Sequence, residues 1–185
     1  MNAGNGDAAV SPPGDPAVSR AAEEPGALFP LSNRAGLALV LGLTAACLLP
    51  FLNKAYYIDD TLFLAAARRI LTAPLDPYGF SINWEGTVDP MSTITKNPPL
   101  ASYYIALVAR CFGWAEPVLH AAFLLPALAV AAGTFLLARR SCRDPLVAAA
   151  AAILTPVFLV SATSVMCDVL VLAFFVWGVL LWIEG

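Results

Sequence analysis

Four apolar stretches divide this chain, and each is close to the length that a helix needs to cross a membrane. They cover residues 35–52, 117–138, 145–162 and 165–183. An α-helix rises about 1.5 Å per residue, so a stretch of about 18 residues extends roughly 27 Å, against a hydrocarbon core of about 30 Å. The pattern predicts an all-α protein, a polytopic bundle of membrane helices.

A long, more polar segment, residues 53–116, separates the first apolar stretch from the second. Within it, residues 61–71 and 98–113 repeat apolar side chains at helical spacing. In the second of these segments, Ser102, Ala106 and Arg110 recur every fourth residue and so lie on one face of the helix. The apolar side chains lie on another face. Both segments are expected to be short helices, the second lying along the membrane interface.

The arginines between the second and third stretches orient the bundle. Arg139, Arg140 and Arg143 fall within a linker of a few residues, which by the positive-inside rule is cytoplasmic. With the N-terminus inside, the first span ends outside, the second returns to the cytoplasm and the third leaves again. Segment 53–116 is then extracytoplasmic. If residues 98–113 also crossed the membrane, the arginines would lie outside. This favours a helix over 98–113 that lies along the membrane interface.

Residues 1–34 are rich in proline, glycine, alanine and acidic residues, a mixture that buries too little apolar surface to fold. A disordered cytoplasmic tail is expected here. The first apolar stretch begins far from Met1 and lacks a basic region directly after the start, so it is not a secretory signal.

Composition agrees with a membrane protein, because 59% of residues are hydrophobic, 12% are charged and the mean hydropathy is +0.76. The net charge of −3 supplies no basic surface for nucleic acid. The four cysteines are scattered and only one histidine, His120, is present, so neither a zinc site nor a disulfide framework is predicted.

Three acids are candidate catalytic residues. Asp59 and Asp60 stand at the start of the helix expected over 61–71, and Asp168 begins the last apolar stretch. One carboxylate is enough to cap a helix, so a pair at the boundary between water and lipid also suggests a general base. Asp168 is equally compatible with stabilising a helix N-terminus and with a functional role.

Lys96, Trp84 and Glu85 are candidate substrate-binding residues. Lys96 precedes Asn97-Pro98-Pro99 and would lie at the level of lipid headgroups, where it either extends to water or pairs with a lipid phosphate. Trp84 fits an aromatic belt, and Trp84-Glu85 could also stack on a sugar.

Taken in order, four motifs resemble the N-terminal part of the GT-C membrane glycosyltransferases. They are Tyr56-Tyr57-Ile58-Asp59-Asp60, Asp76-Pro77-Tyr78, Lys96-Asn97-Pro98-Pro99-Leu100 and Met166-Cys167-Asp168. The sequence looks most similar to the dolichyl-phosphate-mannose protein mannosyltransferase-like group, which includes the Rgt-type bacterial enzymes and the lipid A aminoarabinose transferase. The resemblance covers about residues 35–185.

This resemblance implies a role for each acid and for the lysine. Asp59 matches the family's catalytic base, and Asp60 stands where glutamate is more usual. Lys96 matches the lysine that contacts the lipid phosphate, with Asn97 as one extra residue before the proline. Asp168 matches the acid of the second external loop. The resemblance also implies interfacial helices in the first external loop, and longer family members suggest that this chain is a fragment.

The implied function is transfer of a sugar from a polyprenyl-phosphate donor to a hydroxyl acceptor on a glycan, lipid or protein. The reaction would take place at the extracytoplasmic face of the cell membrane. The resemblance implies no obligatory cofactor and leaves open a divalent cation held by Asp59 and Asp168, as in the related oligosaccharyltransferases. A subunit of a transporter or flippase, with Asp59 and Asp168 as ion sites, and an inactive fragment are the alternatives.

Overall fold

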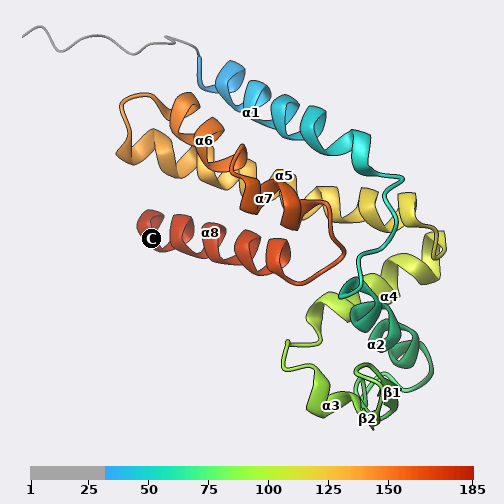
Figure 1. Ribbon diagram of the computed structural model, residues 1–185. Coiled ribbons are helices and arrows are strands. Elements are labelled where there is room, and N and C mark those ends of the chain that lie inside the picture. Colours follow the sequence, from blue (N-terminus) through green and yellow to red (C-terminus); the bar gives the residue numbers. More distant parts are fainter. Residues whose placement is uncertain (1–31) are drawn as a thin grey trace, which may run out of the picture.

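The computed structural model describes residues 32–185 of the chain, and most of these residues are helical (Figure 1). The helices are α1 (Asn33–Leu48), the 3-10 helix η1 (Leu49–Phe51), α2 (Asp60–Thr72), α3 (Met91–Ile94), α4 (Leu100–Phe112), α5 (Glu116–Ser141), α6 (Pro145–Ile153), α7 (Pro156–Ala162) and α8 (Asp168–Glu184). Of the disordered tail expected over residues 1–34, residues 1–31 lie outside the described residues. The expectation is wrong for Asn33 and Arg34, which are helical because Ser32 caps the start of α1.

A short hairpin departs from the all-α expectation. Strands β1 (Ser81–Asn83) and β2 (Val88–Pro90) pair in antiparallel register, with Ile82 opposite Asp89. Gly86 in the connecting turn has φ of +89°, a conformation that L-residues with a side chain rarely adopt. The hairpin carries Trp84 and Glu85 in its turn.

The elements form two groups (Figure 1). Helices α1, α5, α6, α7 and α8 lie side by side as a bundle, and α2, α3, α4 and the hairpin lie together at one end of it. Helices α1 and α6–α7 run toward that end, whereas α5 and α8 run away from it. The start of α1 and the arginine-rich linker between α5 and α6 therefore lie at the opposite end from α2 and α4.

The bundle is held by apolar packing and by one close helix approach. Its buried core joins side chains from α1, α5, α6, α7 and α8, among them Val40, Ala127, Phe135, Ile153, Phe158 and Val169. Gly133 on α5 permits the approach of α8, because a Cβ at this position would lie 2.6 Å from Val176 Cγ1. Nearby, Trp177 Nε1 donates a hydrogen bond of 2.9 Å to the Ala129 carbonyl.

The apolar stretch 145–162, expected to be one span, consists of two helices. Helices α6 and α7 meet at an angle of 61°. The break has a local cause, because Pro156 lacks an N–H and disfavours helical backbone at the residue before it. Thr155 then caps the new helix, and its Oγ1 accepts a hydrogen bond of 3.4 Å from Phe158 N.

Length and composition identify candidate membrane spans among the described residues. Residues 33–51 and helix α5 are each long and apolar enough to cross a bilayer, and the bent pair α6–α7 would be a third span if it crosses as one unit. Helices α4 and α8 are apolar but shorter. These helices indicate a membrane protein.

Helices α2 and α4 pack closely through small side chains. Ala66 and Ala67 on α2, and Ala101, Ser102 and Ala106 on α4, are all buried. The opposite face of α4 is exposed and largely apolar, and it includes Leu100 and Leu107. This outward apolar face is what a helix lying in a membrane interface requires.

Candidate functional site

The adjacent acids Asp59 and Asp60 lie in different environments. Asp60 is the first residue of α2 and is fully buried, with none of its surface exposed. Its Oδ2 accepts a hydrogen bond of 2.7 Å from Tyr57 N, and its Oδ1 accepts one of 2.8 Å from Val165 N. Asp59 is half-buried and, within the described part of the chain, its side chain makes no capping hydrogen bond. Of these two acids, only Asp59 has a carboxylate that accepts no hydrogen bond from a described backbone N–H group.

Burial sets the protonation behaviour of Asp60. Loss of water on burial raises the pKa of its carboxyl group above the ordinary value. The hydrogen bonds from the two backbone N–H groups lower this pKa, and the electrostatic influence of His120 and Lys54 lowers it to a smaller extent. Burial is the larger influence. The raised pKa does not make Asp60 a base for a substrate, because the carboxyl group has no exposed surface and both of its oxygens accept backbone N–H groups; it is placed to position the segments that it joins.

A second contact joins the same two segments. Lys54 Nζ donates hydrogen bonds of 3.2 Å to Thr163 Oγ1 and 3.3 Å to the Thr163 carbonyl. With the contact from Asp60 to Val165, the segment before α2 is therefore tied at two points to the loop before α8. Asp59 lies within the first of these tied segments, between Lys54 and Asp60, and Asp168 follows Val165 by three residues.

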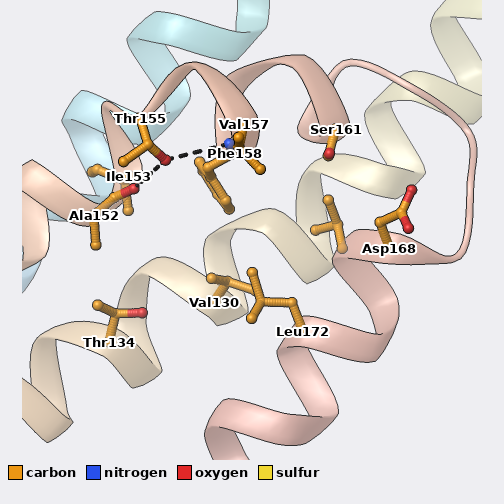
Figure 2. A pocket seen from close by; sticks show the side chains of 11 residues that line it. Val130, Thr134, Ala152, Ile153, Thr155, Val157, Phe158, Ser161, Asp168 and Leu172 are labelled. Carbon is orange, nitrogen blue, oxygen red and sulfur yellow. Dashed lines mark hydrogen bonds between the residues drawn. The ribbon is translucent and has the colours of Figure 1, made fainter.

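Asp168 opens α8 at the rim of a groove of about 390 Å³ between α5, the α6–α7 break and α8. Figure 2 shows its carboxylate pointing away from the apolar side chains of Val130 and Leu172. Thr155 and Ser161 also line the groove. The side chain of Asp168 is exposed, so its carboxylate is accessible to a ligand.

Trp84 and Glu85 line a different pocket, of about 310 Å³. The other lining residues are Leu62, Asp89, Thr93 and Ile94. Leu62 belongs to the first turn of α2, and its N–H donates a hydrogen bond of 3.2 Å to the Asp59 carbonyl. This pocket, with one aromatic ring and two carboxylates, therefore borders the helix turn that begins beside Asp59.

Lys96 lies between α3 and α4 with its side chain exposed. Its Nζ donates a hydrogen bond of 3.0 Å to the Ser92 carbonyl, and Lys96 is not among the lining residues of the two pockets described above. The next residue, Asn97, accepts a hydrogen bond of 2.7 Å from Tyr78 Oη. The structure thus brings Lys96 to the same end of the bundle as the acids but shows no contact between them.

Tyr78 belongs to the same region as Asn97, although sequence analysis assigned it no role beyond its place in the Asp76-Pro77-Tyr78 motif. Burial raises the pKa of its phenol, with smaller contributions from Cys167 and Tyr103. Its side chain donates the hydrogen bond to the Asn97 carbonyl. A tyrosine in an Asp-Pro-Tyr sequence is a turn signal, and nothing local reveals this hydrogen bond.

Tyr56 and His120 are in contact, although the sequence alone did not predict that they meet. Their rings stack at a centroid distance of 5.7 Å, and Tyr56 Oη donates a hydrogen bond of 2.9 Å to the Trp114 carbonyl. Burial, followed by Glu116 and Asp60, raises the pKa of Tyr56 to about 12. His120 Nδ1 lies 3.0 Å from the Glu116 carbonyl, and its buried Nε2 has no hydrogen-bond partner among residues 32–185.

Within residues 32–185, no group of three or more His, Cys, Asp or Glu side chains is arranged to hold a metal ion. Comparison of the chain with protein-family models, curated proteins and solved structures finds no match.

Proposed function

We propose that the protein is a membrane glycosyltransferase that moves a sugar from a polyprenyl-phosphate donor to a hydroxyl acceptor. The observation that carries the proposal is the pair of contacts joining residues 54–60 to residues 163–165. They hold the segment of Asp59 and the segment of Asp168 at one end of the bundle, although more than 100 residues separate these segments. The ordered likeness to the GT-C motifs gives further support.

In the proposed reaction, Asp59 accepts the proton of the acceptor hydroxyl as its oxygen attacks the anomeric carbon. The bond from that carbon to the phosphate oxygen breaks, and the electron pair leaves with the polyprenyl phosphate. The configuration at the anomeric carbon is inverted. Lys96 stabilises the negative charge that develops on the leaving phosphate.

Asp60 and Asp168 have supporting roles in this proposal. Asp60 acts as a positioning residue, because both of its carboxylate oxygens accept backbone N–H groups from separate segments. Asp168 orients the acceptor or supports Asp59. A divalent cation, if the enzyme uses one, would be held by Asp59 and Asp168, since carboxylate oxygens are the ligands that such cations prefer.

The pocket lined by Trp84 and Glu85 is the proposed sugar or acceptor site. An indole ring offers a flat apolar surface to the C–H face of a sugar, and carboxylates accept hydrogen bonds from its hydroxyl groups. Its border with the first turn of α2 supports placing a hydroxyl group near Asp59.

The proposed membrane arrangement has α1, α5, the pair α6–α7 and α8 crossing the bilayer as a GT-C type bundle. The group formed by α2, α3, α4 and the hairpin then lies on the extracytoplasmic face of the cell membrane. Supporting this, the arginine-rich linker and the start of α1 lie together at the opposite end of the bundle.

The test is transfer of a radiolabelled sugar from a polyprenyl-phosphate donor by membranes that carry the full-length protein. Asp59→Asn keeps the size of the side chain but removes the base, and we expect transfer to fall by about 100-fold or more. Asp144→Asn, at the opposite end of the bundle, is the matched control and should transfer normally. Undiminished transfer by the Asp59 variant would remove the assignment of the base.

One observation favours a second candidate, a transporter subunit. The break between α6 and α7 lies beside the groove that Asp168 lines, and broken helices next to an acid are typical of ion-coupled transporters. A transporter would move a solute into vesicles in an ion-dependent way that Asp168→Asn abolishes. A transferase would instead convert the donor without any ion gradient.

A further inference from the structure

We propose that the groove between the end of α1 and α7 binds a membrane lipid, with the lipid phosphate on Lys54 and a hydrocarbon chain along the groove. This site is separate from the proposed transfer reaction, in which Lys96 meets the donor phosphate. The inference therefore does not depend on the proposed function.

The shape and lining of the groove fit one hydrocarbon chain. It has a volume of about 450 Å³ and is lined by Cys47, Leu48, Phe51, Lys54, Leu159, Val160 and Thr163. Apart from Lys54 and Thr163, all of these side chains are apolar or, for Cys47, weakly polar. Phe51 and Val160 are exposed to 49% and 65%, so the groove is open along its side. A chain entering from the bilayer would cover this apolar surface.

Lys54 supplies a fixed cation at the polar end of the groove. Its ammonium group has three N–H donors, and the contacts with Thr163 engage two of them. Among the described residues, no carboxylate lies within the 4.0 Å of an ion pair with Lys54. Asp60 interacts with it at longer range, but both Asp60 oxygens already accept backbone hydrogen bonds. The ammonium is held in place without a neutralising partner.

The two features together point to an amphiphilic anion. A free phosphate ion would meet only one cation and would leave the apolar groove uncovered. A neutral lipid would cover the groove but leave the ammonium unpaired. A lipid phosphate meets both requirements, because its oxygens accept the remaining N–H of Lys54 and its chain covers Phe51 and Val160.

The probe is phosphatidic acid with a photoactivatable chain, added to the purified full-length protein in neutral detergent. We expect crosslinks at Phe51, Leu159 or Val160. Because a hydrogen bond to a charged group contributes at least a factor of ten in affinity, Lys54→Gln should weaken labelling about tenfold, and Lys54→Arg should restore part of it. Lys96→Gln, the change at the second of the two lysines in the chain, should leave labelling unchanged.

Val160→Trp is a second variant that keeps Lys54 but fills the groove, and it should also lose labelling. Diacylglycerol with the same photoactivatable chain should label about tenfold less than phosphatidic acid. Equal labelling by diacylglycerol, or by the Lys54→Gln protein, would overturn the proposal. Displacement of the lipid by inorganic phosphate alone would reassign the site to a free ion. Asp59→Asn should keep full labelling, so the transfer reaction and the lipid site can fail independently.

Discussion

Asp59 and Asp60 show that neighbouring residues of the same type can have different tasks. The carboxylate of Asp60 joins the start of α2 to the loop before α8, and it does so from a position with no exposed surface. Asp59 faces outward enough to meet a ligand. The motif of two acids predicts a candidate site, and the burial of each acid indicates which of the two could meet a ligand.

Removing the Asp60 carboxylate should destabilise the protein more than removing that of Asp59. Asp60→Ala leaves the N–H groups of Tyr57 and Val165 without an acceptor, and a buried unsatisfied donor costs about 1–3 kcal/mol each. Asp59→Ala should change stability by less than about 1 kcal/mol. Unfolding in detergent, followed by circular dichroism, measures both. Equal losses for the two variants would contradict the positioning role of Asp60.

The helices of the chain follow from the sequence to different degrees. Periodic apolar residues predicted helices over 61–71 and 98–113, and the structure has α2 and α4 at these places. The break at Thr155-Pro156 was overlooked, although a threonine before a proline is a recognisable start signal for a helix. The uniform apolar character of residues 145–162 concealed it. The hairpin was not predicted either, and its strands have only three residues each.

The approach of α5 and α8 depends on a glycine. Gly133→Ala would place a Cβ 2.6 Å from Val176 Cγ1 and 3.2 Å from Trp177 Nε1, so the two helices must shift. We expect a loss of about 1–3 kcal/mol of stability, as for other overpacked contacts. Gly178→Ala on α8, whose added Cβ would meet no described atom within 4 Å, should instead be neutral or stabilise by up to about 1 kcal/mol. Thermal unfolding in detergent compares the pair, and equal effects would contradict this account of the helix contact.

Across the whole molecule, the candidate site depends on contacts that local sequence patterns do not reveal. Asp60 and Val165 are 105 residues apart, and Lys54 and Thr163 are 109 residues apart. Counting spans and arginines predicted that Asp59 and Asp168 share one side, but not which side chains join their segments. The roles of Lys54 and Thr163 are visible only in the packed structure, because their contact joins distant parts of the chain.

The most direct test of the central claim concerns the sides of the membrane on which the two ends of the bundle lie. One protein keeps Cys142, in the arginine-rich linker, as its single cysteine, and a second carries only Glu85→Cys in the hairpin turn. A membrane-impermeant maleimide added to intact cells should label the cysteine at position 85 and should reach Cys142 only after permeabilisation. Labelling of both positions from the outside, or of Cys142 alone, would contradict an extracytoplasmic site built from Asp59 and Asp168.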